Sequence, residues 1–216
     1  LMMEKWMGGD MHPSYRILMG PGPSNVHYRV YQAMSNPVIG YLDPQILACM
    51  DEISEMLRGV FQTKNQVTLA ISATGSSGME ASYVNFVEPG DVVVIGINGF
   101  FADRMTQVAS RCGAKVIRVE EEWGKMIEPE KMIKALREHP EAKVCGVVHG
   151  ETSTGVRQPL EEIGAYCKRT DTLLVVDAVT TIGGYDVKVD EWGIDVCYGS
   201  SQKCLGVPPG LSPITV

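Results

Sequence analysis

The 216-residue sequence predicts an α/β fold in which a mostly parallel sheet is flanked by helices on both faces. Two observations carry this prediction. Short apolar runs rich in β-branched residues recur along the chain, and amphipathic helical patterns of ten or so residues separate them. Strands that alternate with helices pair in parallel, because each helix provides the crossover that returns the chain to the start of the next strand.

A loop and two helices are predicted before this alternation begins. Residues 20–25 read G-P-G-P-S-N, which forms a rigid loop because proline fixes φ and glycine allows conformations that proline excludes. Helical patterns cover residues 28–34 and 44–59. In the second, apolar side chains recur at helical spacing, Pro44 suits the first turn and Gly59 suits the end.

Strands and helices alternate from residue 67 onward. The predicted strands are residues 67–72, 92–97, 115–119, 144–148, 173–176 and 195–198, and the predicted helices are residues 79–87, 103–111, 129–138 and 160–168. In a parallel α/β sheet, ligands bind in the crevice beyond the carboxyl ends of the strands. The functional residues are therefore expected in the loops that follow the apolar runs.

Composition narrows the class of protein. The formal charge is −7, and no run of Lys and Arg is present, which disfavours a nucleic-acid or anionic-membrane partner. Six cysteines without a C-x-x-C pair predict reduced thiols and a cytoplasmic location, and they predict no metal site. No apolar stretch is long enough for a signal peptide or a membrane span.

The loop after the first strand has the composition of an anion site. Residues 73–78 read A-T-G-S-S-G and precede a helix, so exposed backbone N–H groups and the helix N-terminus could bind a phosphate. A simple Gly/Ser turn explains the same residues. The sequence contains neither a Walker A motif nor G-x-G-x-x-G, which disfavours a nucleotide-binding domain.

Two further loops carry aromatic or polar groups. Phe100 and Phe101 follow the second strand, where an aromatic ring can stack on a flat cofactor, although core packing is the alternative. Residues 149–155 are dense in hydroxyl groups that could reach a ligand, and solvation is the alternative there. His149 is expected to be a hydrogen-bonded scaffold residue.

Asp177 and Lys203 are the strongest candidates for chemistry. Asp177 ends a nearly continuous apolar run, where a carboxylate is costly to bury without a cationic partner such as a protonated pyridine nitrogen; a cap is the alternative. Lys203 follows a strand in an uncharged segment. Desolvation disfavours its ammonium form and so favours a nucleophilic amine.

These residues lie in motifs that resemble those of the class V aminotransferases, which are fold type I enzymes dependent on pyridoxal 5′-phosphate (PLP). The nearest likeness is to the alanine–glyoxylate and serine–pyruvate aminotransferase group. The motifs are G-P-G-P-S at 20–24, A-T-G-S-S-G-M-E-A at 73–81, E-P-G-D at 88–91, H-G-E-T-S-T-G-V at 149–156, L-L-V-V-D-A-V at 173–179 and G-S-S-Q-K-C-L-G-V-P-P-G at 199–210. Each is weak alone, but their order and spacing extend over nearly the whole chain.

The resemblance implies a role for each site residue. Lys203 would be the Schiff-base lysine and proton shuttle, and Asp177 would pair with the pyridinium nitrogen. Thr74, Gly75, Ser76 and Gln202 would hold the cofactor phosphate, and Thr152 would bond the phenolic oxygen of the ring. Phe101 and Val179 would pack on the two faces of the ring. The backbone at Gly22 would approach the substrate carboxylate. The sequence departs from the family pattern at three of these positions. Many relatives have Trp where this sequence has Phe101 and His where it has Ser76, and some have Ser where it has Thr152.

The resemblance also implies an activity and a domain organisation. The activity would be transamination between alanine or serine and glyoxylate or pyruvate, in a homodimer. Residues 1–25 would form an N-terminal arm and substrate-side loop, and residues 26–216 an incomplete PLP-binding domain that lacks the C-terminal small domain and its substrate-carboxylate arginine. The alternatives are another class V activity, such as cysteine desulfuration or phosphoserine transamination, and a catalytically silent fragment that binds only PLP or a partner subunit.

Overall fold

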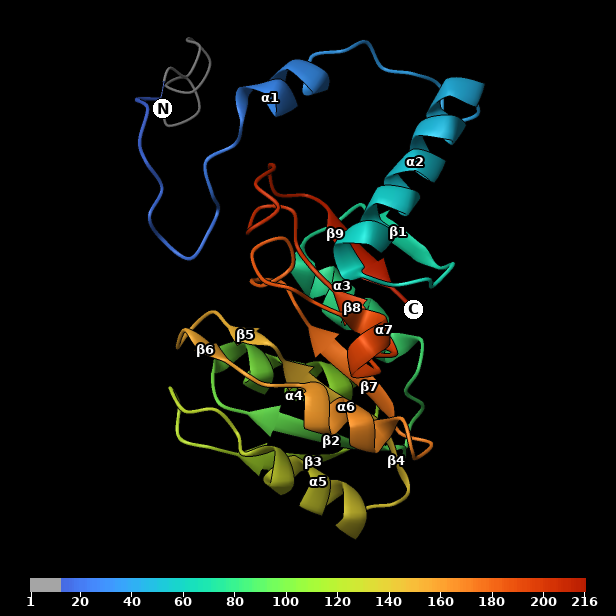
Figure 1. The fold of residues 1–216 in the computed structure, drawn as a ribbon, viewed down its shortest axis with the longest axis vertical. Coiled ribbons are helices and arrows are strands. Elements are labelled where there is room, and N and C mark those ends of the chain that lie inside the picture. Colours follow the sequence, from blue (N-terminus) through green and yellow to red (C-terminus); the bar gives the residue numbers. More distant parts are fainter. Residues whose placement is uncertain (1–12) are drawn as a thin grey trace, which may run out of the picture.

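A computed structural model describes residues 13–216, and the first part of the predicted N-terminal arm, residues 1–12, lies outside the described residues (Figure 1). The main sheet has seven strands in the order β1-β9-β8-β7-β4-β2-β3, and β5 and β6 form a separate hairpin. The strands are β1 Thr68–Ile71, β2 Val92–Ile97, β3 Lys115–Glu120, β4 Ala142–Val148, β5 Gly150–Glu151, β6 Val156–Arg157, β7 Leu173–Asp177, β8 Val196–Tyr198 and β9 Ser212–Thr215. The helices are α1 Tyr28–Met34, α2 Pro44–Phe61, α3 Gly75–Val84, α4 Phe100–Arg111, α5 Pro129–Glu138, α6 Glu161–Cys167 and α7 Val189–Trp192.

The main sheet is mostly parallel, as predicted. Strands β3, β2, β4, β7 and β8 pair in parallel one after another. Strand β9 is antiparallel to both of its neighbours, β8 and β1, so β1 points the same way as the parallel strands. The sequence did not predict β9, whose four residues include Pro213, a residue that usually argues against an interior strand.

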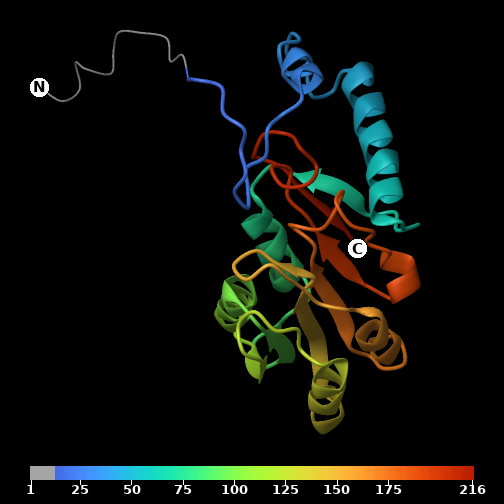
Figure 2. The same cartoon turned by 60° about the vertical axis from the view of Figure 1, so that its left-hand side comes forward.

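Helices cover both faces of the sheet because successive strand residues point to opposite sides. In β2, Val93 and Ile95 belong to an apolar cluster that also includes residues of α3 and α4. Val94 belongs to the opposite cluster, to which α2, α5, α6 and α7 contribute. Figure 2 shows these two helical layers on either side of the sheet. The predicted fold class is therefore confirmed.

The bounds of three predicted helices were wrong by two residues or more. Helix α2 continues past Gly59 to Phe61, which is fully buried, and ends where Gln62 adopts a left-handed conformation. Helix α3 begins at Gly75 and ends at Val84, rather than spanning 79–87, so the small-residue loop itself supplies its first turn. Helix α4 begins at Phe100 instead of residue 103. In each case tertiary packing, and not local propensity, sets the end.

The parallel strands bring their carboxyl ends to one edge of the sheet. The loops after β1, β2, β4, β7 and β8 therefore meet there, and they contain the residues that the sequence singles out. Within residues 13–216, no helix combines the length and apolar character that a bilayer crossing requires.

Candidate active site

A small cavity of about 140 Å³ opens at this edge of the sheet. The loops after β1, β2, β7 and β8 line it, together with the first turns of α3 and α4. Its lining residues are Thr74, Gly75, Ser76, Met79, Phe101, Asp177, Val179, Ser200, Gln202 and Lys203. All the residues predicted to contact a cofactor, except Thr152, therefore lie around one space.

Thr152 lines a second, larger cavity of about 490 Å³, and so does Gly22. Lys203 lines both cavities, which places the lysine between the predicted cofactor side and the predicted substrate side. The wall of the larger cavity comes mainly from residues 18–25, the β5–β6 hairpin and the segment after β7.

The G-P-G-P-S loop packs directly on the lysine loop. The Lys203 Nζ donates a hydrogen bond to the carbonyl oxygen of Pro21 at 2.5 Å. The backbone N–H of Ser24 donates to the Gln202 carbonyl at 3.0 Å, and the Ser24 hydroxyl donates to the Lys203 carbonyl at 2.9 Å. These three bonds hold two segments together that lie about 180 residues apart in the sequence.

Gly22 allows this close approach. Its φ is +118°, a conformation that residues with a side chain rarely adopt. A Cβ at this position would lie 2.6 Å from Cδ and 2.8 Å from Nζ of Lys203. Any other residue here would displace the lysine side chain.

Asp177 is buried at the end of β7 and keeps two hydrogen-bond donors. The backbone N–H of Val179 donates to Oδ1 and the Tyr198 hydroxyl donates to Oδ2, each at 2.9 Å. Burial raises the pKa of Asp177 to about 6, with a smaller contribution from Glu151, whereas the two donors and Lys203 oppose the rise. No described Lys, Arg or His forms an ion pair with this carboxylate, so none of them directly compensates its charge.

Two tyrosines, Tyr83 and Tyr198, lie near Asp177. Both are fully buried, and burial raises the pKa of Tyr198 and of Tyr83. The Tyr83 hydroxyl has no hydrogen-bond partner among the described residues. Sequence reasoning missed Tyr198; its place as the last apolar residue of a predicted strand, level with Asp177 on the neighbouring strand, was the available signal.

The loop after β1 has the features of a phosphate site. Thr74 is the N-cap residue of α3, but its hydroxyl makes no capping bond and is free for a ligand. A Cβ on Gly75 would lie 2.9 Å from Cγ2 of Val179 and 3.0 Å from Cβ of Ser200, so only glycine fits. Ser76 accepts a 3.3 Å hydrogen bond from Arg104.

Arg104 is a cation that sequence reasoning did not single out. Its guanidinium lies 5.0 Å from the centroid of the Phe100 ring and 5.4 Å from that of Phe101, besides its bond to Ser76. Its position three residues after Phe101, one helical turn along α4, could have indicated it.

His149 and Cys204 do not join the cavity around Asp177. The His149 ring is buried, its Nδ1 is 2.9 Å from the Thr181 hydroxyl, and burial, assisted by Arg157, lowers its pKa to about 4. This neutral, hydrogen-bonded ring agrees with the predicted scaffold role. Cys204 is exposed, and its thiol donates to the Thr180 carbonyl at 3.3 Å.

No group of three or more potential metal ligands is found within residues 13–216. All six cysteines lie in this part of the chain and are free thiols.

Comparisons of the sequence with a family model and with known proteins point to the same family. Residues 25–216 match the model of the class V aminotransferases. The (S)-ureidoglycine–glyoxylate transaminase of Bacillus subtilis is 48% identical over 200 residues, which cover 93% of this chain and 48% of that protein. The alanine–glyoxylate aminotransferase of Drosophila melanogaster is 45% identical over 201 residues, which cover 93% and 51%.

Solved structures agree with the sequence comparison. The alanine–glyoxylate aminotransferase of a Nostoc species superposes with a TM-score of 0.95 at 46% identity, covering 99% of this chain and 56% of that chain. The chain thus spans about half the length of the relatives it matches. The match over nearly all of its residues, in sequence and in fold, shows that the chain belongs to the class V aminotransferases, a family dependent on pyridoxal 5′-phosphate.

Proposed function

We propose that this protein catalyses the PLP-dependent transfer of an amino group from a small amino acid, alanine or serine, to a small 2-oxo acid, glyoxylate or pyruvate. One observation carries the proposal: Lys203 and Asp177 line the same cavity at the carboxyl edge of the sheet, beside a loop suited to phosphate. All three relatives described above have glyoxylate in their names, which supports glyoxylate as the acceptor. The name of the B. subtilis relative makes ureidoglycine a further candidate donor.

The residues around the cavity fit PLP. The free Thr74 hydroxyl, the Gly75 and Ser76 backbone at the start of α3, and Gln202 would hold the phosphate. Phe101 and Val179 would cover the two faces of the ring. Thr152, on the neighbouring cavity wall, would bond the phenolic oxygen, and the buried carboxylate of Asp177 would receive a protonated ring nitrogen.

When bound, the ring withdraws electrons from the substrate Cα. Asp177 would keep the ring nitrogen protonated, which requires an ionised carboxylate. The Tyr198 hydroxyl and the Val179 N–H stabilise that ionised form. Lys203 Nζ would take the proton from the substrate Cα and deliver it to C4′ of the cofactor. Positioned general acid–base catalysis of this kind contributes about 10²–10⁴-fold. The backbone at Gly22 orients the substrate carboxylate beside Nζ.

The test is where PLP attaches. The protein mixed with PLP should develop a visible absorption band, and borohydride reduction followed by peptide mass analysis should place the cofactor on residue 203. The Lys203→Ala variant should show neither, whereas Lys134→Ala, which removes an exposed lysine of α5, should behave as the wild type. Attachment at another lysine, or an unchanged spectrum in Lys203→Ala, contradicts the proposal.

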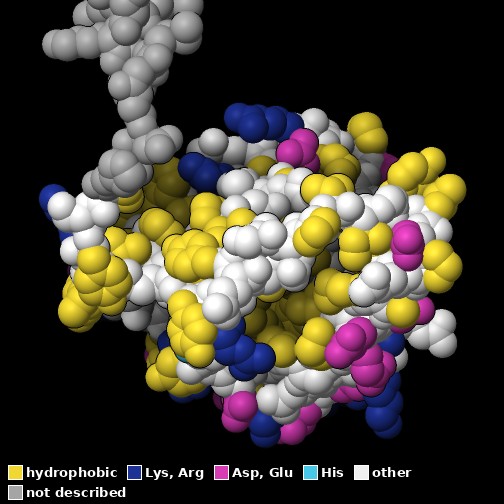
Figure 3. All heavy atoms as spheres, turned by 90° about the horizontal axis from the view of Figure 1, so that it is seen from above, with side chains coloured by type: hydrophobic (Ala, Val, Ile, Leu, Met, Phe, Trp, Pro, Cys, Tyr) yellow, Lys and Arg dark blue, Asp and Glu magenta, His cyan; other side chains and the backbone are white. Residues whose placement is uncertain are grey.

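We propose, further, a homodimer in the cytoplasm. Large apolar side chains are exposed along α1 and α2, as expected of a surface that a second copy covers. Figure 3 shows apolar side chains gathered on the end of the molecule that carries these helices. Six free thiols suit a reducing compartment.

A further inference from the structure

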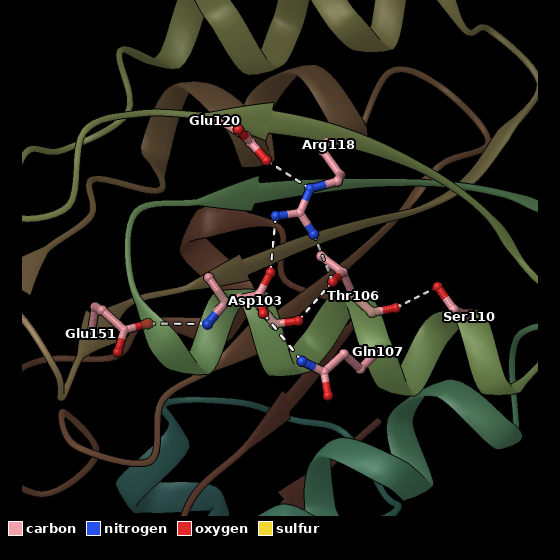
Figure 4. Close-up of polar contacts among 8 residues, drawn as sticks. Asp103, Thr106, Gln107, Ser110, Arg118, Glu120 and Glu151 are labelled. Atoms are coloured by element: carbon pink, nitrogen blue, oxygen red, sulfur yellow. Dashed lines mark hydrogen bonds and ion pairs between the residues drawn. The ribbon is translucent and has the colours of Figure 1, made fainter.

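Glu151 is a buried acidic residue that the sequence motifs contain but that the proposed chemistry does not use. Only 1% of its surface is exposed. Its Oε2 accepts hydrogen bonds from the backbone N–H groups of Phe101 and Ala102, each at 3.0 Å. Figure 4 shows this carboxylate at the first turn of α4. The N-cap residue of that helix is Gly99, which has no side chain, so the cap comes from strand β5.

The other carboxylate oxygen binds the turn of the β5–β6 hairpin. Glu151 Oε1 accepts from the Ser153 backbone N–H at 3.0 Å and from the Ser153 hydroxyl at 2.7 Å. The Ser153 hydroxyl oxygen in turn accepts from the Phe100 N–H at 2.9 Å. Glu151 and Ser153 together thus satisfy the first three N–H groups of α4, which have no partner within the helix.

The site requires a carboxylate rather than an amide. Every neighbour of Glu151 in this network is a donor, and a carboxylate accepts at both oxygens, whereas an amide would turn an NH₂ group toward another donor. No described basic residue forms an ion pair with Glu151; its charge faces the positive end of the α4 dipole instead. The fit is tight, since a Cβ on Gly99 would lie 2.2 Å from Cγ of Glu151.

Glu151 lies between two residues that face the proposed cofactor. It is bonded to the backbone of Phe101, whose side chain lines the cavity beside Asp177, and it directly precedes Thr152 in the hairpin. The network therefore determines where the Phe101 ring lies relative to the Thr152 hydroxyl. It joins segments 50 residues apart in the sequence.

We infer that Glu151 is a positioning residue of the cofactor site, which caps α4 from the hairpin and so holds Phe101 against the cofactor ring. This inference rests on the proposed PLP function. Glu151 itself touches no reacting atom; it acts through Phe101 and the hairpin.

The test compares the dissociation constant of PLP in Glu151→Gln and in a matched control. Asp103→Asn changes a carboxylate in the first turn of the same helix, but Asp103 pairs with Arg118 at 2.9 Å (Figure 4) and does not line the cavity. Hydrogen bonds to a charged group are strong, so their loss in Glu151→Gln should displace Phe101. We expect this variant to bind PLP about tenfold more weakly, or weaker still. Asp103→Asn should stay within about twofold of the wild type, because exposed ion pairs contribute little.

A double-mutant cycle separates positioning from a general loss of structure. If Glu151 acts through the Phe101 ring, Glu151→Gln should cost little further affinity in a Phe101→Ala background. The circular dichroism of bound PLP should also change in Glu151→Gln and not in Asp103→Asn. Ser153→Ala, which removes only an exposed hydroxyl of the network, should weaken binding in the same direction and remains measurable if Glu151→Gln does not fold.

Equal losses of affinity in the wild-type and Phe101→Ala backgrounds would overturn the inference, as would wild-type affinity in both Glu151→Gln and Ser153→Ala. Failure of the wild-type protein to bind PLP at all would instead contradict the proposed function. The two failures are therefore distinguishable.

Discussion

Asp177 shows how a single residue depends on its surroundings. The titratable groups that face it are Tyr198 and Cys197 from β8, Tyr83 from α3, Glu151 from β5 and Lys203 from the loop after β8. Burial dominates and raises the pKa from 3.8 to about 6. Tyr198 is the one side chain among them that donates a hydrogen bond to the carboxylate, so it favours the ionised form that a pyridinium partner needs.

The raised pKa has a consequence for stability without the cofactor. A carboxyl group whose pKa is higher in the folded state binds protons more tightly when folded. The stability that protonated Asp177 contributes to the folded protein is therefore fully present below about pH 3.8, and it is lost as the pH rises through about 6. The loss amounts to about 3 kcal/mol at neutral pH.

In Tyr198→Phe, the loss of stability that accompanies ionisation of Asp177 should continue to higher pH. Removing the hydroxyl removes a donor to the ionised carboxylate, which raises the pKa of Asp177 further and destabilises the cofactor-free protein by about 1–3 kcal/mol more at pH 8 than at pH 4. Asp177→Asn should flatten this pH dependence. Urea unfolding of the cofactor-free variants from pH 4 to 8 measures both effects. Identical pH profiles for the wild type, Tyr198→Phe and Asp177→Asn would contradict the expectation.

At the scale of elements, the lysine loop and the G-P-G-P-S loop act as one unit. Ser24 bonds the backbone of the lysine loop, and Gly22 provides the space that the Lys203 side chain occupies. The position of the amine thus depends on a segment from the start of the chain. A change in that segment should alter catalysis more than stability, because its residues are mostly exposed.

Gly22→Ala should lower the rate of transamination by about tenfold or more, the factor that a loss of 1.4 kcal/mol produces. The added Cβ both strains a backbone at φ +118° and displaces Lys203. Gly20→Ala is the matched control, since nothing lies within 4 Å of its Cβ and its φ lies outside the left-handed region. Single-turnover rates with alanine measure the effect in both variants. Equal rates in the two would show that Lys203 does not depend on this loop.

At the scale of the whole molecule, α1 and α2 project beyond the sheet with much apolar surface exposed (Figures 1 and 3). On α2, Leu47, Met50 and Met56 are each about half exposed. Helix α2 contacts the rest of the fold mainly through its last turns, where Phe61 is buried. A surface of this kind is stable in water when a partner covers it.

Met50→Glu combined with Met56→Glu should weaken the proposed homodimer at least tenfold, because two charges would be buried without partners in the interface. Met126→Glu, at a similarly exposed apolar residue between β3 and α5, should leave the dimer unchanged. Sedimentation over a range of protein concentrations measures the dissociation constant. A monomeric wild type would refute the homodimer, and unaltered dimers in the double variant would place its interface elsewhere.

Much of the fold follows from local patterns. Period-two and period-3.6 hydrophobicity are properties of neighbouring residues, so the alternation of strands and helices, the fold class and the loops at the strand ends were predictable. The motifs in those loops were sufficient to indicate the family and to group Lys203 with Asp177. The roles of these residues stay predictions.

Only the tertiary structure decided the rest, because it depends on residues far apart in the sequence. Strand β9 is stable as a strand since it lies between β1 and β8, despite Pro213. Tyr198 reaches Asp177 across neighbouring strands, and Glu151 caps a helix 50 residues earlier. The hydrogen-bond partner of a buried group depends on which segments pack beside it, and no local sequence pattern specifies that partner.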